Sequence, residues 1–369
     1  MFFLEFNNKY KIVHLTNELG NYYYGGVGTY INEIYRYRRG DMGFIYVDFD
    51  SDTDYRSEEF LEKKDIAVVT SNEIHKLQNI KCDILVVHFY ELWFCLTPEI
   101  IKDKKIVYVI HSVPTPEPAP GPDPFIGNEE VRNRFFYLCD VADILICVSF
   151  AEKRKLEKIY PQFADKIKVV HNGMSFNENV AKNIKYENGR KNFGYIGRLD
   201  YRKGVLECIK AIERTEGELY LACPDNDHTY FKMIKNYIDG ARLWDRIHFL
   251  GWCAGDRKEE FFMFVDALII PSLYEPFGYT ALEAMNFSVP VISSDNGGLS
   301  EILEGYKYTY NPYIDEDLYK CICEFQTDET EEVAKQVDIL EKNKTGFTAK
   351  DMCDNYYRIW KIMLNEQNI

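Results

Sequence analysis

The chain has 369 residues, of which 46% are hydrophobic and 28% charged, with 22 glycines and 13 prolines, a composition that excludes intrinsic disorder and collagen-like repeats. At about 150 residues per domain, this length favours two domains, each large enough to bury its own core. The 59 acidic residues exceed the 44 basic ones and give a net charge of -15, which argues against binding to nucleic acid, because such proteins usually show a basic domain or stripe.

The first 170 residues alternate short β-branched runs with longer amphipathic segments. Compact apolar runs of this kind are typical of strands that are buried on both faces of a parallel sheet. The strands expected here cover residues 11–15, 43–47, 83–88, 106–110, 144–148 and 167–170. Amphipathic segments such as 29–37 and 150–160 predict helices that join parallel strands by right-handed crossovers. We therefore expect a Rossmann-like, doubly wound α/β domain over residues 1–175.

Residues 176–191 interrupt this pattern, since they are rich in Asn and Lys and contain few apolar residues, and they predict an interdomain linker. The alternation then resumes. The strands expected here cover residues 193–197, 219–222, 247–250, 267–270 and 289–293. They predict a second Rossmann-like domain over residues 192–345. The helical pattern of residues 346–369 predicts a C-terminal helix that packs back on the first domain.

Six of the 13 prolines fall in residues 114–124, directly after the expected strand that ends near His111. Proline fixes φ and removes an N–H donor, so this alternation favours an extended loop. Two interpretations stay open for this loop. It is either a stiff surface connection or a wall of an acceptor cleft, because ligands bind at the carboxyl ends of such strands.

A glycine turn precedes the first expected helix, where residues 24–29 read Tyr-Gly-Gly-Val-Gly-Thr. Gly25 and Gly26 allow backbone N–H groups to approach a ligand closely, and the helix N-terminus behind them carries about half a positive charge. The turn therefore predicts an anion site. The spacing is not G-x-G-x-x-G, and a simple tight turn is the competing interpretation.

The cations Arg198 and Lys203 follow the first expected strand of the second domain, in the sequence Gly-Arg-Leu-Asp-Tyr-Arg-Lys-Gly of residues 197–204. Arg198 can bind a diphosphate through two parallel hydrogen bonds, whereas Lys203 acts as a point charge. A helix is expected to begin at Val205, close to both cations. The motif predicts a diphosphate site, with a solvated charge run as the alternative when it is considered alone.

The most specific pattern is the segment 271–285, which contains two glutamates eight positions apart. Glu275 precedes an expected helix, and Glu283 lies about one and a half turns inside that helix. A carboxylate accepts hydrogen bonds only, so Glu275 suits the hydroxyls of a sugar and Glu283 suits two adjacent hydroxyls of a ribose. The N–H groups near Tyr279 and Thr280, at the start of the helix, can face a phosphate.

Together these motifs resemble the retaining glycosyltransferases of family 4, which have the GT-B architecture of two Rossmann-like domains facing a central cleft. The resemblance rests on Gly25-Gly26, His111, residues 170–173, Gly197-Arg198, Lys203-Gly204, the E-x7-E element from Glu275 to Glu283, and residues 296–298. It covers most of the chain in the order that the family shows. The E-x7-E element with its Pro-Phe-Gly insert is the most specific part.

The resemblance implies a retaining, metal-independent hexosyltransferase (EC 2.4) that moves a sugar from a nucleotide-sugar donor, by default a UDP-sugar, to an acceptor hydroxyl. It implies that Arg198 and Lys203 hold the leaving diphosphate, and that Glu275 holds the donor sugar. It further implies that Glu283 holds the ribose and that His111 lies beside the reacting sugar. The catalytic residues expected are therefore His111, Arg198, Lys203 and Glu275, without a side-chain nucleophile or a cofactor. The residues expected to contact the donor are Gly25, Gly26, Arg198, Lys203, Glu275, Phe277, Gly278, Tyr279, Thr280 and Glu283.

Two alternatives concern individual residues. His111 could be a strand-end histidine that bonds to backbone, and the histidines at 14, 88 and 171 also lie near expected strand ends and could line the same crevice. Residues 48–54 contain overlapping D-x-D triplets, a pattern that chelates a divalent cation in glycosyltransferases of another architecture. Position 6 of the corresponding calcium loop is Thr53 instead of glycine, so we expect a solvated acidic loop and no metal.

Two alternatives concern the function. One is a nucleotide-sugar epimerase or hydrolase of the same architecture, which would need a carboxylate acid and base pair at one sugar carbon. The other is a non-catalytic, glycosyltransferase-like partner protein. The acceptor stays open between a glycan, a lipid, a small molecule and a peptide, and the oligomeric state cannot be read from the sequence.

The sequence also predicts a cellular compartment. The ten cysteines are scattered without a C-x-x-C pair, and they are expected to be reduced core thiols. The first nine residues lack a basic region and a long apolar run, and no window reaches 18 apolar residues, which indicates a cytoplasmic protein. Residues 150–160 carry four cations interrupted by two glutamates, so weak peripheral contact with the inner membrane face is expected at most.

Overall fold

The structure is a computed structural model that describes residues 10–19, 25–49, 66–115, 128–178, 191–224 and 229–365. The chain divides into two units, which are described separately below. Unit 1 combines residues up to Met174 with Ala349–Ile369, and unit 2 contains Ser175–Thr348. Three expectations fall largely outside the described residues, namely the acidic loop beyond Phe49, the proline segment beyond Thr115 and the linker at residues 179–190.

A seven-stranded parallel sheet forms the centre of unit 1, in the order β3-β2-β1-β4-β5-β6-β7. Its strands are β1 (Ile12–Thr16), β2 (Met42–Asp48), β3 (Ile66–Thr70), β4 (Ile84–Val87), β5 (Lys105–Ile110), β6 (Ile144–Cys147) and β7 (Ile167–Val169). Every side chain of the central strand β4 is buried, as expected for a strand that is covered on both faces. The prediction of a doubly wound α/β layer is confirmed for this unit.

Helices cover both faces of this sheet. They are α1 (Gly26–Arg36), η1 (Ser71–Asn79), η2 (Tyr90–Cys95), α3 (Pro98–Ile101), α4 (Glu129–Val141), α5 (Phe150–Ile159), η3 (Pro161–Lys166) and α13 (Ala349–Met363). On one face Leu15 belongs to an apolar cluster that includes Phe135 of α4 and Leu156 of α5. Successive strand residues point to opposite faces, so the neighbouring His14 faces the other side, where it meets Trp360 of α13.

The C-terminal helix α13 is part of unit 1 and is joined to it by backbone as well as side-chain contacts. The Ala349 N–H donates to the Met174 carbonyl at 3.0 Å, and the hydroxyl of Tyr357 accepts from the Arg39 N–H at 2.6 Å. Trp360 is 1% exposed, which makes it one of the largest fully buried side chains described. The core of unit 1 is therefore completed by a segment that follows the whole of unit 2 in the chain.

Unit 2 contains a six-stranded parallel sheet in the order β10-β9-β8-β11-β12-β13. Its strands are β8 (Asn192–Ile196), β9 (Glu218–Ala222), β10 (Ile247–Phe249), β11 (Ala267–Ile270), β12 (Val291–Ser294) and β13 (Thr309–Tyr310). The first strand of this unit, β8, lies in the middle of the sheet. Strands β9 and β10 follow on one side of β8, and β11 pairs with β8 on its other side. This is the strand order of a Rossmann-like fold, as predicted.

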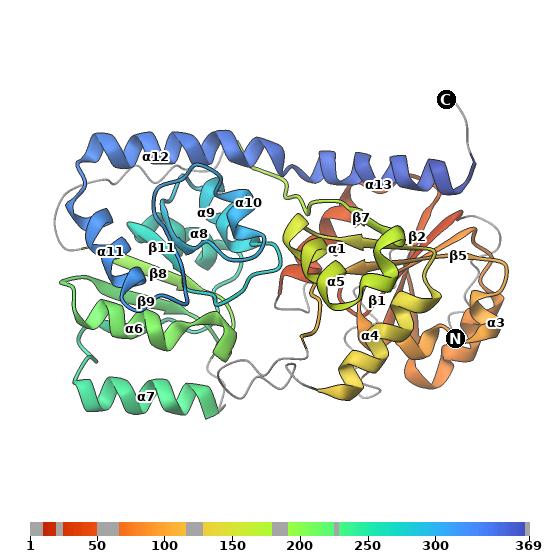
Figure 1. Ribbon diagram of the computed structural model, residues 1–369, viewed down its shortest axis with the longest axis horizontal. Helices are drawn as coiled ribbons and strands as arrows, with labels where there is room; N and C mark the ends of the chain where they lie inside the picture. The colour runs from red at the N-terminus through yellow and green to blue at the C-terminus, as the bar shows by residue number, and fades with distance from the viewer. Residues whose placement is uncertain are drawn as a thin grey trace. The chain divides into compact units, whose positions relative to one another are not determined.

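Helices α6 and α7 lie on one side of this sheet and α8 to α10 on the other (Figure 1). The helical segments of unit 2 are η4 (Tyr201–Lys203), α6 (Val205–Glu213), α7 (Thr229–Ala241), α8 (Asp256–Phe264), α9 (Tyr279–Asn286), α10 (Leu299–Ile302), α11 (Asp317–Thr327), α12 (Thr330–Asn343) and η5 (Lys344–Gly346). Within the described ranges, none of the helices is both long and apolar enough to cross a bilayer.

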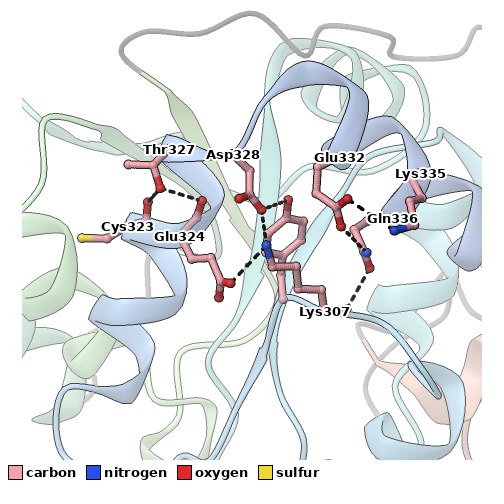
Figure 2. Close-up of polar contacts among 9 residues, drawn as sticks. Lys307, Cys323, Glu324, Thr327, Asp328, Glu332, Lys335 and Gln336 are labelled. Atoms are coloured by element: carbon pink, nitrogen blue, oxygen red, sulfur yellow. Dashed lines mark hydrogen bonds and ion pairs between the residues drawn. The ribbon is translucent and has the colours of Figure 1, made fainter.

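A polar network ties Lys307 and Tyr308, which directly precede the edge strand β13, to the junction of α11 and α12 (Figure 2). Lys307 contacts Glu324 at 3.1 Å and Asp328 at 2.6 Å. The same Asp328 carboxylate accepts a hydrogen bond from the hydroxyl of Tyr308 at 2.8 Å. The side chain of Lys307 is 30% exposed, and that of Asp328 is 19% exposed. Burial would raise the pKa of Asp328, but its bonds to Lys307 and Tyr308 outweigh burial and lower it.

Some features differ from the sequence expectation. Strands β3 and β13 were not predicted, and both lie at sheet edges. Asp48 was expected in a solvated acidic loop, but it is the last residue of β2 and is only 7% exposed. His14 and His88 were placed at strand ends as candidates to line a crevice. That was wrong, because the two side chains are 0% and 1% exposed.

Candidate functional site

The candidate donor site lies in unit 2 at the point where the strand order reverses. Strands β9 and β11 flank β8, so the chain leaves β8 in one direction and later returns on the other side. In doubly wound sheets, ligands bind outside the carboxyl ends of the strands at such a switch point. The loop after β8 carries Arg198 and Lys203, and the loop after β11 carries Glu275.

These two loops are packed against each other through their backbones. The Leu273 N–H donates to the Arg202 carbonyl at 2.8 Å. Gly204 has a φ of +64°, and a Cβ at this position would lie only 2.0 Å from the carbonyl oxygen of Pro271. Glycine is therefore required there both by its left-handed conformation and by the close approach of the second loop.

Lys203 and Glu275 form an ion pair across the two loops, with Nζ 2.5 Å from Oε2, and each side chain is 19% exposed. The hydroxyl of Ser272 donates to the same carboxylate oxygen at 3.2 Å. Burial would raise the pKa of Glu275, but the charge and hydrogen bond of Lys203, with help from Arg202 and Ser272, lower it below its ordinary value. Glu275 is therefore an ionised, well-fixed hydrogen-bond acceptor at the switch point.

A third loop, after β12, donates hydrogen bonds to the backbone of the loop that carries Glu275. The Gly298 N–H donates to the Glu275 carbonyl at 2.8 Å, and the amide of Asn296 donates to the Leu273 carbonyl at 2.6 Å. Gly297 has a φ of +77°, and a Cβ there would lie 2.1 Å from the Glu275 carbonyl oxygen. The residues at 296–298 therefore fix the backbone of the Glu275 loop.

Helix α9 begins immediately after this loop. Its N-cap is Gly278, with a φ of +121°, and a Cβ at this position would lie 2.7 Å from a methyl group of Leu299. Phe277 and Tyr279 are buried and make an edge-to-face contact at 5.2 Å, while Thr280 is partly exposed. The rings of Phe277 and Tyr279 are thus packing elements that hold the helix start in place.

The structure gives Glu283 and Arg198 partners of their own. Glu283 on α9 pairs with Lys258 on α8, with Nζ 2.5 Å from Oε1, and its side chain is 16% exposed. Arg198 is more accessible, at 51% exposure, and its guanidinium lies 3.6 Å from the Asp200 carboxylate. Lys203 and Glu275 are therefore in direct contact, whereas Glu283 and Arg198 each contact a different residue.

The site residues that the sequence predicts in unit 1 are Gly25, Gly26 and His111. His111 follows β5 directly and is partly exposed, but its Nε2 atom is buried and has no hydrogen-bond partner within the described ranges. Its ring meets the ring of Tyr30 edge to face, at 4.8 Å between centroids. Burial lowers the pKa of His111, so the ring is neutral near pH 7. The interpretation that His111 bonds to backbone receives no support from this geometry.

Two further histidines, His14 and His88, are buried near His111. His14 Nδ1 and His88 Nε2 are 2.8 Å apart, so one ring N–H donates a hydrogen bond to the unprotonated nitrogen of the other ring. Burial lowers the pKa of His14 to about 3, and burial with the neighbouring His14 and His111 lowers the pKa of His88 well below its ordinary value. This neutral pair is part of the core that supports the His111 strand end.

The glycine turn provides less than the sequence suggests. Gly25 is the N-cap of α1 with an extended φ of -174°, and a Cβ there would meet nothing within 4 Å. Gly25 and Gly26 are both exposed. Among the residues that the structure describes, neither conformation nor packing requires glycine at position 25. The anion site and the simple tight turn both stay open as interpretations.

Four residues of the unit 2 site were not assigned a role from the sequence: Arg202, Lys258, Ser272 and Asn296. Arg202 and Ser272 were visible inside the motifs as neighbours of Lys203 and Glu275. Asn296 is part of residues 296–298, which carry the resemblance, but its contact with the Leu273 carbonyl could not be read from the sequence. Lys258 lies outside the motifs and far in the chain from Glu283, so only the fold could reveal it. Over the part of the chain that the structure describes, no group of three or more His, Cys, Asp or Glu side chains is placed to hold a metal ion.

Two α/β units, each built on a parallel sheet, with an ion pair at the switch point of the second, define a two-domain transferase fold of the GT-B type. Solved structures share this fold. Sucrose-phosphate synthase from Thermosynechococcus elongatus superimposes with a TM-score of 0.75 at 15% identity, over 97% of this chain and 100% of that chain. Anabaena HepE in complex with UDP and glucose also gives 0.75, at 19% identity, over 95% and 99%.

Residues 67–178 match the model of Glycosyltransferase Family 4, and residues 176–345 match that of Glycosyl transferases group 1. The two models together match residues 67–345, and the chain belongs to the glycosyltransferases that they describe, group 1 and Family 4. Among curated relatives, two uncharacterized glycosyltransferases of Methanocaldococcus jannaschii are 34% and 33% identical to 43% and 50% of this chain. The matched segments span 44% and 50% of the length of those relatives. Glycogen synthase of Mycobacterium tuberculosis is 27% identical over 45% of this chain and 40% of its own.

Proposed function

We propose that this protein is a retaining glycosyltransferase that moves a sugar from a nucleotide-sugar donor to an acceptor hydroxyl. The observation that carries the proposal is the ion pair between Lys203 and Glu275 at the switch point of unit 2. A fixed carboxylate suits sugar hydroxyls, and a fixed cation beside it suits the diphosphate to which that sugar is attached. The family membership and the strand order support the same conclusion.

The donor would bind to unit 2. In this proposal Glu275 accepts hydrogen bonds from the donor sugar, and Arg198 and Lys203 hold the diphosphate. Glu283 accepts from the ribose through the carboxylate oxygen that is not bonded to Lys258. The N–H groups at the start of α9, near Tyr279 and Thr280, face a phosphate, because the first N–H groups of any helix lack intrahelical partners.

The chemistry would depend on orientation and on charge stabilisation. The bond from the anomeric carbon to the diphosphate oxygen breaks, the acceptor oxygen bonds to that carbon on the same face, and the hydroxyl proton passes to the departing diphosphate oxygen, so the configuration is retained without a side-chain nucleophile. Negative charge builds up on the leaving diphosphate, and we propose that Arg198 and Lys203 stabilise it there. Lys203 is bonded to Glu275 before the donor arrives, so its ammonium group would then contact the carboxylate and the diphosphate together.

The neutral imidazole of His111 is proposed to lie beside the reacting sugar. A ring that stays neutral near pH 7 can donate a hydrogen bond to a sugar hydroxyl without adding charge. A UDP-sugar is the first donor to test, because the fold neighbour HepE was also solved in complex with UDP-glucose. A glycan, a lipid, a small molecule or a peptide would each be a suitable acceptor class.

The two other functions make different demands on this site. An epimerase or hydrolase would need a carboxylic acid and a carboxylate at one sugar carbon, and the low pKa and ion pair of Glu275 make it an acceptor of hydrogen bonds instead of an acid. A non-catalytic partner would not need the fixed Lys203–Glu275 pair. Donor binding without turnover would favour that function.

The test is to incubate the protein with UDP-, GDP-, ADP- and dTDP-sugars and to measure free nucleotide, with NMR of the sugar product in the absence of acceptor. We expect slow release from one donor, which accelerates when an acceptor is present, and Glu275→Ala should abolish it. Glu331→Ala, which removes an exposed carboxylate on α12, is the matched control and should leave the rate unchanged. If no nucleotide sugar binds or turns over, or if Glu275→Ala retains the full rate, the proposal is wrong.

A further inference from the structure

Glu152 lies in the first turn of α5 and is completely buried. The sequence places it in a segment with four cations, where a glutamate would be expected to face solvent. The structure instead gives it an exposure of 0%. A buried carboxylate is costly unless hydrogen bonds and favourable charges compensate for the lost water. Its burial therefore indicates a specific contact.

That contact is with the loop that carries His111. The Val113 N–H donates to Glu152 Oε2 at 2.6 Å, and both residues are buried. The strands that precede the two segments are neighbours, since Ile110 of β5 lies opposite Cys147 of β6. His111 therefore sits between two fixed points, the end of β5 on one side and the Val113 anchor on the other.

The local structure of α5 fixes the position of the Glu152 carboxyl group. Ser149 is the N-cap of the helix, and its hydroxyl accepts the Glu152 N–H at 3.1 Å. The carboxylate lies at the positive N-terminal end of the helix, which stabilises negative charge. A hydrogen bond from a backbone N–H to an ionised carboxylate is about twice as strong as one between neutral groups. Glu152 can thus hold the Val113 backbone firmly.

We propose that Glu152 is a positioning residue that sets the place of His111 in the glycosyl-transfer site. Glu152 acts through the backbone of Val113 and does not itself touch the donor or the acceptor. This inference rests on the proposed function, because it assigns Glu152 to the same site through His111. It also extends that site to a residue that none of the sequence motifs contains.

The experiment compares Glu152→Ala and Glu152→Gln with a matched control on the same helix, Glu157→Ala. Glu157 contacts Lys153 at 3.5 Å and is 37% exposed, so its removal changes the helix charge without touching the His111 loop. Two quantities are measured, normalised to the folded fraction. One is kcat with the best donor, together with the donor Kd. The other is the NMR signal of the His111 ring in protein labelled on its seven histidines, assigned by its loss in His111→Gln.

We expect Glu152→Ala to lower kcat by about 10- to 100-fold, because a displacement on the order of 1 Å of a reacting group has an effect of this size. The donor Kd should change far less than kcat, since the contacts proposed for the diphosphate, the donor sugar and the ribose come from Arg198, Lys203, Glu275 and Glu283, which all belong to unit 2. Glu152→Gln keeps an acceptor for the Val113 N–H and should recover part of the rate. The His111 signal should shift in Glu152→Ala and not in Glu157→Ala.

Two results would overturn the inference. One is a Glu152→Ala protein with wild-type kcat and an unshifted His111 signal. The other is a loss of activity that matches the loss of folded protein in every variant, which would make Glu152 a stabilising residue only. If the wild-type protein turns over no nucleotide sugar, the proposed function fails separately, and the His111 signal still shows whether Glu152 sets the position of that ring.

Discussion

Gly204 offers a sharp test of how the two loops of the donor site are held together. The residue connects Lys203 to helix α6, and the first loop meets Pro271 of the second loop there. Gly204→Ala would place a Cβ 2.0 Å from the Pro271 carbonyl oxygen, a separation that real Cβ atoms essentially never show. The atom in the way is backbone, so the two loops would have to separate.

The cost can be worked out from two contributions. A non-glycine residue in the left-handed conformation costs about 1–2 kcal/mol. Forcing extra volume into a packed site costs about 1–3 kcal/mol more. We therefore expect Gly204→Ala to lower the free energy of unfolding of unit 2 by about 2–5 kcal/mol. Separation of the loops would also lengthen the 2.5 Å contact between Lys203 and Glu275 and weaken donor binding.

Urea unfolding and donor titration would measure both effects, with Gly251→Ala as the matched control. Gly251 has a similar φ of +71°, but a Cβ there would meet nothing within 4 Å. It therefore carries the conformational cost alone, about 1–2 kcal/mol. Equal losses of stability in the two variants would refute the reasoning, because the close approach to Pro271 would then contribute nothing.

Two further predictions concern parts of the fold away from the donor site. The pKa of His14 in the folded protein is about 3, and that of His88 is also well below 6.5. As pH falls below 6.5, the unfolded chain therefore binds more protons than the folded one. The free energy of unfolding should then fall by up to about 1.4 kcal/mol per pH unit for each histidine. Denaturant curves between pH 7 and 4.5 should show a shallower decline for His14→Gln than for the wild type, and equal slopes would mean that His14 is not held neutral. Lys307→Met removes the ammonium group that pairs with Asp328 and keeps the hydrogen bond from Tyr308, so we expect a loss of about 1–3 kcal/mol in the free energy of unfolding and a raised pKa for that carboxyl. Unchanged stability in Lys307→Met at pH 7 would show that the network in Figure 2 contributes little.

Much of the fold follows from hydrophobic periodicity. Runs such as Ile-Leu-Val-Val in β4 are long and apolar enough to predict a strand buried on both faces. The two missed strands lack that signal. Strand β13 has only two residues, and β3 is an edge strand in which four of its five residues are only partly buried. Edge strands pack on fewer neighbours, so their sequences are less constrained to be apolar.

The donor site could be predicted less completely, and the reason is distance along the chain. Lys203 and Glu275 each stand in a recognisable motif, but their 2.5 Å contact joins positions 72 residues apart. Lys258 was not predicted because nothing near it in the sequence identifies Glu283 as its partner. The spacing of residues along α5 also could not show that Glu152 is buried. A glutamate in the first turn of a helix has the same spacing whether it contacts a neighbouring loop or faces solvent.

The division of the chain has a consequence for its synthesis. Unit 2 is drawn from Ser175–Thr348, so it can fold as soon as that segment has left the ribosome. Unit 1 must wait, since Trp360 and the rest of α13 emerge only after the entire second unit has been made. During translation the face of the first sheet that α13 will cover is open to water and to chaperones. Chains that end at Thr348 and are released from the ribosome should therefore show protease resistance in the later-made unit and sensitivity in the earlier one.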